Sequence, residues 1–177
     1  MNRVAIIQTR MKSTRLPKKV MKDIKGKPLI EHLVNRLSLS KYIDKIVVAT
    51  TTDSSNDILV DFLENINVDV FRGSENDVLD RYVSAAKFYD ADIIIRITSD
   101  CPVIDSDIVD KCIDKFCKNS YDYLATNNFP DGLDTEVCSY EALKLSNNST
   151  KSNYDREHVT PYINNPKKFK VGYLENN

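Results

Sequence analysis

The residues best suited to chemistry form a basic loop over positions 10–20, directly after the apolar run Val4–Ile7. Five residues of this loop are basic, namely Arg10, Lys12, Arg15, Lys18 and Lys19. Ser13 and Thr14 add hydroxyl groups, and Pro17 keeps the loop from forming one continuous helix. Guanidinium, ammonium and hydroxyl donors together suit the oxygens of a polyphosphate. A solvated charged surface is the alternative, but ligands of open α/β sheets lie beyond the carboxyl ends of strands, where this loop begins.

Acidic residues that could hold a cation lie at two further places. Asp100 follows the apolar and β-branched run Ile93–Thr98, which is typical of a strand at the centre of a sheet. At that end of the strand it could hold Mg²⁺ against phosphate oxygens, or it could cap the turn before Pro102. Asp134 and Glu136 would point to the same side of a strand, so they could converge on a metal or on sugar hydroxyls.

Motifs that usually bind phosphate are absent from the sequence. Only four glycines occur, and neither G-x-G-x-x-G nor G-x-x-x-x-G-K-[ST] is present. This argues against a dinucleotide-dependent oxidoreductase and against a P-loop NTPase, so side chains must provide any phosphate site. A charged cluster with Arg156 and His158 could bind substrate, although surface charge at the start of a helix explains it equally well.

Composition narrows the class of protein further. The 177 residues carry 25 basic and 26 acidic side chains, so a formal charge of -1 gives no general attraction to nucleic acid or to an anionic membrane. No apolar run approaches the length that spans a bilayer, and we expect a cytoplasmic protein. The four cysteines form no C-x-x-C pair, which favours reduced thiols over a zinc site or a disulfide framework.

Apolar periodicity predicts alternating strands and helices. Strands are expected at 4–7, 45–50, 68–71, 93–98, 123–126, 135–139 and 169–173. Helices are expected at 28–38, 56–65 with Ser54 or Ser55 as its cap, 77–88, 105–118, 140–145 and 153–162. The alternation predicts an α/β fold, a single Rossmann-like three-layer domain over residues 1–177 with a mostly parallel, doubly wound sheet.

Several stretches resemble one enzyme family in the same order along the chain: AIIQTRMKSTRLPKKVMKDIKGKPLI, FRGSENDVLDRY, RITSDCP, DGLDTEV and REHVTPYI. They resemble cytidylyltransferases that activate acidic sugars, of the acylneuraminate and 3-deoxy-manno-octulosonate types. The sequence is most similar to the branch of spore coat polysaccharide biosynthesis protein F. The resemblance covers essentially the whole chain and implies the fold of nucleotide-diphospho-sugar transferases.

The resemblance also implies roles for particular residues. It places Arg10, Ser13, Arg15 and Lys19 on triphosphate-binding positions, Asp77 and Arg81 beside the nucleotide base, and Asp100 on the metal-binding aspartate. The catalytic candidates are therefore Arg10, Arg15 and Lys19. The nucleotide-binding candidates are Thr9, Ser13, Thr14, Asp77, Arg81, Asp134 and Arg156, and the metal candidates are Asp100 and Glu136.

The reaction implied is Mg²⁺-dependent transfer of CMP from CTP to a sugar or sugar-phosphate acceptor, with release of pyrophosphate, in surface polysaccharide biosynthesis. A homodimer is also implied. Members of the family usually continue through another strand and helix carrying a D-x-x-x-D-L-like segment, which this sequence does not contain. Either the chain is truncated, or Asp134 and Glu136 alone assist the metal. The alternatives are a guanylyl- or uridylyltransferase of the same fold, or a catalytically incomplete nucleotide-binding module.

Overall fold

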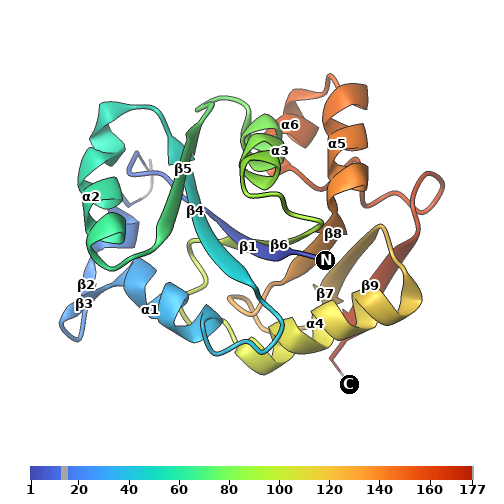
Figure 1. The fold of residues 1–177 in the computed structure, drawn as a ribbon, viewed down its shortest axis with the longest axis horizontal. Coiled ribbons are helices and arrows are strands. Elements are labelled where there is room, and N and C mark those ends of the chain that lie inside the picture. Colours follow the sequence, from blue (N-terminus) through green and yellow to red (C-terminus); the bar gives the residue numbers. More distant parts are fainter. Residues whose placement is uncertain (13–15, 177) are drawn as a thin grey trace.

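A seven-stranded sheet lies between two layers of helices in the computed structural model, which describes residues 1–12 and 16–176 (Figure 1). The strands follow the order β5-β4-β1-β6-β8-β7-β9 across the sheet. Their bounds are β1 Arg3–Gln8, β4 Lys45–Thr51, β5 Asp69–Gly73, β6 Ile93–Thr98, β7 Tyr123–Asn127, β8 Glu136–Ser139 and β9 Val171–Glu175. β2 Asp23–Ile24 and β3 Lys27–Pro28 form a separate two-stranded ribbon.

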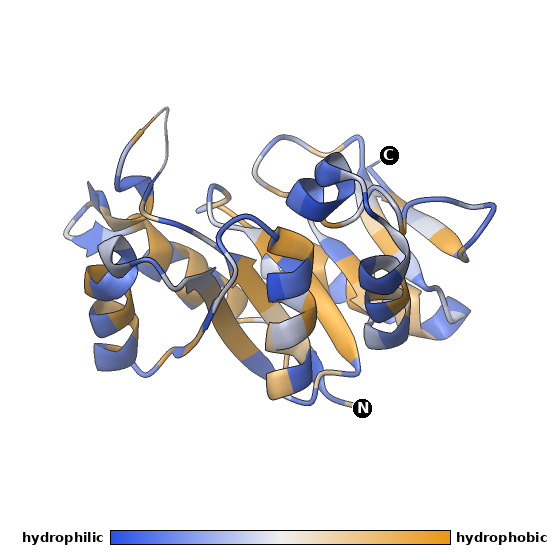
Figure 2. Cartoon of the chain, turned by 90° about the horizontal axis from the view of Figure 1, so that it is seen from above, coloured by the Kyte–Doolittle hydropathy of each residue, from blue (hydrophilic) through white to orange (hydrophobic). Residues whose placement is uncertain are grey.

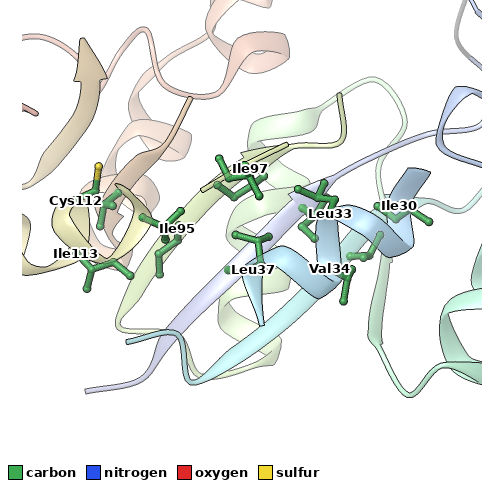
Figure 3. Close-up of a cluster of buried hydrophobic side chains, with 14 of the residues drawn as sticks. Ile30, Leu33, Val34, Leu37, Ile95, Ile97, Cys112 and Ile113 are labelled. Atoms are coloured by element: carbon green, nitrogen blue, oxygen red, sulfur yellow. The ribbon is translucent and has the colours of Figure 1, made fainter. Parts of the chain in front are cut away.

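Apolar runs form the central strands because both faces of the sheet are covered. In β1, Ala5 and Ile7 point into one core, while Val4 and Ile6 point into the other. Figure 3 shows part of the first core, in which Leu33 and Leu37 lie with Ile95 of β6. Burial on both faces explains the continuous hydrophobic character of these strands, and Figure 2 shows the apolar residues concentrated on them.

The helices divide between the two faces of the sheet. α1 Leu29–Leu37, α2 Asp57–Asn65 and α4 Ser106–Asn119 contribute to the first core, and α3 Val78–Phe88 and α5 Tyr140–Ser149 contribute to the second. The short α6 Asn153–His158 packs beside α3. Within the described residues, no helix combines the length and apolarity needed to cross a membrane.

The predicted mostly parallel, doubly wound sheet is confirmed, with one antiparallel insertion. β8 runs antiparallel to both of its neighbours, β6 and β7. The reason is the connection: residues 128–135 contain no helix that could carry the chain back across the sheet, so the chain must return in the opposite direction.

Predicted boundaries differ from the structure at a few element ends. Asp53, rather than Ser54 or Ser55, caps the turn before α2, since its carboxylate accepts the N–H of Ser55 at 2.9 Å. α5 extends to Ser149, beyond the predicted end at residue 145. α6 ends at His158, because Val159 has a φ of 73° and cannot continue the helix.

The order of the strands fixes where a ligand can bind. The chain proceeds from β1 to β4 and β5 on one side, then returns to place β6 on the other side of β1. Gln8 and Thr98 are register partners at the ends of β1 and β6, so the loops that follow these two strands begin side by side. Such a switch point leaves a crevice at the carboxyl ends of the strands.

Candidate active site

A cleft of about 530 Å³ lies at this switch point between β1 and β6. β1 and its loop, β6 and its following turn, α3 with the preceding loop, and α6 all contribute to its walls. The lining residues are Gln8, Thr9, Arg10, Lys19, Val20, Glu75, Asn76, Val78, Arg81, Arg96, Thr98, Ser99, Asp100, Glu157 and His158. Charged and polar side chains dominate, which suits a charged ligand rather than an apolar one.

Met11 anchors the beginning of the basic loop. Its side chain is buried, its N–H donates to Oδ1 of Asn56 at 2.9 Å, and its carbonyl accepts the N–H of Lys18 at 3.0 Å. Asn56 is itself buried and also bonds Thr50, Thr51 and the carbonyl of Asp53. The β4–α2 connection therefore holds the start of the loop after β1 in place. Arg10, the residue before Met11, is exposed and lines the cleft.

Lys19 and Asp100 face each other across the mouth of the cleft. Nζ of Lys19 lies 3.4 Å from Oδ2 of Asp100, whose side chain is 55% exposed. Partial burial raises the pKa of the Asp100 carboxyl, but the Thr98 hydroxyl and the Lys19 charge outweigh this and lower the pKa below its usual value. Asp100 is therefore a charged, accessible carboxylate beside a cation.

Arg81 is a buried cation in the cleft wall. It is 1% exposed, Nη1 donates to the carbonyl of Ser74 at 2.7 Å, and Nε has no partner among the described residues. No carboxylate pairs with it in the part of the chain that the structure describes, and burial lowers its pKa. Gly73 makes room for its stem, because a Cβ there would lie 2.9 Å from Cγ of Arg81.

Arg96 lies deeper in the cleft and is held by Glu136. Nη1 of Arg96 donates to Oε2 of Glu136, while Oε1 accepts the hydroxyls of Tyr123 at 2.6 Å and Thr160 at 2.8 Å. The guanidinium also lies over the ring of Tyr82, 5.8 Å from its centroid. The adjacent carboxylate raises the pKa of Arg96 despite its burial.

An ion pair outside the cleft wall fixes α6 against α3. Asp77 caps α3 by accepting the N–H of Asp80 at 3.0 Å, and its other oxygen accepts Nε of Arg156 at 2.6 Å. Arg156 also donates to the carbonyl oxygens of Asn147 and Thr150, both at 3.1 Å. The pair holds the helix whose last two residues, Glu157 and His158, line the cleft.

The structure brings five of the predicted site residues together in the cleft wall: Thr9, Arg10, Lys19, Arg81 and Asp100. Asp77, Arg156, Asp134 and Glu136 do not line it; Asp134 is exposed in the loop before β8, and the others bond protein groups. Ser13, Thr14 and Arg15 lie outside the described residues. These placements show where the predicted residues are, while their roles stay predictions.

Sequence reasoning did not select several other residues of the cleft: Gln8, Glu75, Asn76, Arg96, Thr98, Ser99 and Glu157. The sequence does give a signal for Gln8, Thr98 and Ser99. They lie at or directly after the ends of β1 and β6, the two strands that lead into the predicted loops. Arg96 also gave a signal, because it is a lone charge inside the run IIIRIT. Glu75 and Asn76 lie in the stretch FRGSENDVLDRY and Glu157 in REHVTPYI, but no residue-level pattern distinguished them from their neighbours.

Comparison with known proteins gives the family. A family model described as Cytidylyltransferase matches residues 4–175. The chain belongs to this family. The predicted family and the predicted class of enzyme, a nucleotidyltransferase, are thereby confirmed.

Three similar proteins illustrate the relationship. An uncharacterized protein of Methanocaldococcus jannaschii is 44% identical over 97% of this chain and 71% of its own length. Spore coat polysaccharide biosynthesis protein SpsF of Bacillus subtilis is 36% identical over 96% of this chain and 73% of its own length. The structure of a cytidylyltransferase from Leptospira borgpetersenii superposes with a TM-score of 0.94 at 37% identity, covering 99% of this chain and 76% of that one.

Proposed function

We propose that this cytidylyltransferase transfers CMP from CTP to a sugar or sugar-phosphate acceptor and releases pyrophosphate. An acceptor oxygen attacks the α-phosphorus in line and forms a new P–O bond, and a hydroxyl acceptor gives up its proton to solvent. The bond between the α-phosphorus and the oxygen bridging to the β-phosphorus breaks. The electron pair of that bond leaves with pyrophosphate. We further propose that the product serves surface polysaccharide biosynthesis, as the name of the Bacillus subtilis relative suggests.

The observation that carries this proposal is the meeting of Lys19 and Asp100 beside Arg10 at the switch point. In the proposed complex, Arg10 and Lys19 bind the β- and γ-phosphates and neutralise the leaving pyrophosphate. Arg15, which the resemblance places in the same group, completes this set. Fixed cations of this kind stabilise charge that develops in the transition state without reorganising during the reaction.

The donor set fits Mg²⁺ bound together with the nucleotide. No group of three or more acidic, cysteine or histidine side chains that could hold a metal occurs in residues 1–12 and 16–176. Mg²⁺ commonly uses one or two carboxylates and completes its shell with phosphate oxygens and water, which Asp100 and a triphosphate could supply. Bound there, the ion would draw charge from the α-phosphoryl group. Both oxygens of Glu136 already accept protein donors, so we assign the metal to Asp100 alone.

Arg81 and the polar end of β1 would serve the nucleotide. Unpartnered buried polar atoms of Gln8, Thr9 and Arg81 occur in residues of the cleft wall. A bound nucleotide can supply the partners that such groups lack, which offsets the free-energy cost of burying them. We propose that Thr9 and Arg81 contact CTP on the side of the cleft nearest α3.

Calorimetry tests the proposal by measuring the binding of CTP, GTP, UTP and ATP in the presence of Mg²⁺. A second assay measures pyrophosphate release with candidate sugar acceptors. We expect CTP to bind most tightly and Mg²⁺ removal to weaken it. Preference for GTP or UTP would indicate a guanylyltransferase or a uridylyltransferase of the same fold instead. CTP binding without pyrophosphate release from any acceptor would indicate a nucleotide-binding module, and no nucleotide binding would refute the site.

A further inference from the structure

Lys19 and Asp100 are assigned to different ligands, yet their side chains contact each other. The proposed function gives Lys19 to the phosphates and Asp100 to Mg²⁺, while Nζ of Lys19 lies 3.4 Å from Oδ2 of Asp100. Lys19 begins the short 3₁₀ helix η1 Lys19–Met21, and Asp100 lies in the turn after β6, so the contact crosses the cleft mouth. Each ligand must therefore deal with a residue that serves the other.

The backbone of Lys19 is fixed, so the approach of its ammonium group to Asp100 is built into the fold. Its N–H donates to the carbonyl of Leu16 at 3.2 Å, and its own carbonyl accepts the N–H of Lys22 at 3.1 Å. Val20, the next residue, is 2% exposed and belongs to the first core. The side chain of Lys19 is 30% exposed and can turn to another anion without moving this backbone.

Charge makes the two proposed ligands depend on each other. An ammonium group and a divalent cation on one carboxylate would lie a few ångströms apart, and like charges at that separation repel. Asp100 alone has too little negative charge to offset both, and no cluster of three or more potential metal ligands occurs in residues 1–12 and 16–176. A triphosphate relieves the conflict, because its oxygens attract the ammonium group and the divalent cation alike.

We propose that Lys19 makes the cation site at Asp100 conditional on the nucleotide. Its ammonium group opposes a divalent cation while it pairs with Asp100, and it turns away when a triphosphate offers a stronger anionic partner. The inference rests on the proposed function, which supplies both ligand assignments. Its consequence is that the chain takes up the cation and the triphosphate together instead of holding a metal ion in advance.

Metal binding without nucleotide tests the proposal from the side of Lys19. Electron paramagnetic resonance measures the binding of Mn²⁺, used as a probe for Mg²⁺, to wild type, Lys19→Met and the double variant Lys19→Met/Asp100→Asn. Methionine keeps an unbranched side chain and removes the charge. Lys22→Met is the matched control, because Lys22 is exposed in the same segment and does not line the cleft.

Nucleotide binding without metal tests the same contact from the side of Asp100. Calorimetry in EDTA measures the affinity of Asp100→Asn for CTP, since Lys19 then has no carboxylate partner and is available to the phosphates. Asp131→Asn is the control for the loss of one negative charge, because Asp131 is exposed and does not line the cleft. Circular dichroism checks that every variant is folded.

We expect Lys19→Met to bind Mn²⁺ at least threefold more tightly than wild type, and the double variant to lose this gain. Asp100→Asn should bind metal-free CTP at least threefold more tightly than wild type. Both controls should match wild type. An absent gain in either single variant, an equal gain in its control, or a gain that survives in the double variant would overturn the proposal. Failure of wild type to bind CTP with Mg²⁺ would instead refute the proposed function.

Discussion

Asn56 should decide whether the basic loop is held in place, although it does not line the cleft. Its side chain makes four hydrogen bonds: to the N–H of Met11 at 2.9 Å, to the hydroxyls of Thr50 and Thr51 at 3.0 and 2.8 Å, and to the carbonyl of Asp53 at 3.1 Å. In Asn56→Ala, the buried Met11 N–H and Thr50 hydroxyl lose this partner.

The free-energy cost follows from these two orphaned groups. Each buried group left without a partner costs about 1–3 kcal/mol, which gives roughly 2–6 kcal/mol for the pair. A decrease of about 3 kcal/mol in the free energy of unfolding would lower the Tm of a chain of this size by roughly 6–12 °C. Since Met11 begins the loop that carries Lys19 back to the cleft, CTP affinity should fall at least tenfold as well.

Thermal unfolding and CTP calorimetry measure these two effects, and Arg72→Met is the matched control. Arg72 supports the same β4–α2 connection, donating to the carbonyls of Thr51 at 3.2 Å and Asp53 at 3.0 Å, but it has no hydrogen bond to the described part of the basic loop. The control should therefore lose stability and keep its CTP affinity. A Tm for Asn56→Ala within 2 °C of wild type, or an equal loss of CTP affinity in both variants, would refute the reasoning.

Three further predictions concern the cleft. Arg81→Met should raise Tm, because it removes a buried charge that forms no ion pair with a carboxylate among the described residues. It should also weaken CTP binding at least tenfold by calorimetry, and a lower Tm would contradict this reasoning. Gly73→Ala should lower the free energy of unfolding by about 1–3 kcal/mol, as measured by denaturant unfolding. The new Cβ would lie 2.9 Å from Cγ of Arg81 and 3.0 Å from the Phe71 ring. The pKa of Asp100 is lowered, so this carboxylate is ionised above its usual value of about 3.9 and its contribution is lost only below that. Between pH 5 and 8, Mg²⁺-dependent CTP binding should therefore change only with the charge of the terminal phosphate of CTP, and it should be absent in Asp100→Asn.

The strands and helices that make up the layers of the fold could be predicted, because each is set by the apolar residues and caps within its own stretch of sequence. Every main strand and helix was expected within a few residues of its place, since buried strands are continuous apolar runs and helices begin at caps such as Asp77 and Asp105. The antiparallel direction of β8 was not predicted, because it depends on which strands become neighbours. The β2–β3 ribbon was missed because two-residue strands have no periodicity.

From residue types and their places in the chain, the site was predictable only at the ends of strands; Arg81 of α3 was predicted from the family resemblance. Arg10, Lys19 and Asp100 meet because parallel strands release their loops at one edge, a rule that needs no coordinates. Asp134 and Glu136 illustrate the limit: alternation along a strand was assumed, but β8 begins only at Glu136, so Asp134 lies in the preceding loop. The partners of Glu136 come from β6, β7 and residue 160, and no local pattern reveals such long-range contacts.

Polar groups left without partners concentrate where the proposed ligands bind. Seven buried side-chain polar atoms lack a hydrogen bond among the described residues, and four belong to the cleft wall: those of Gln8, Thr9, Arg81 and Arg96. Each lowers the free energy of unfolding of the unliganded chain. CTP would supply partners to Gln8, Thr9 and Arg81, so its binding should stabilise the chain through these residues. Arg81→Met should therefore abolish most of the rise in Tm that CTP produces in the wild-type chain.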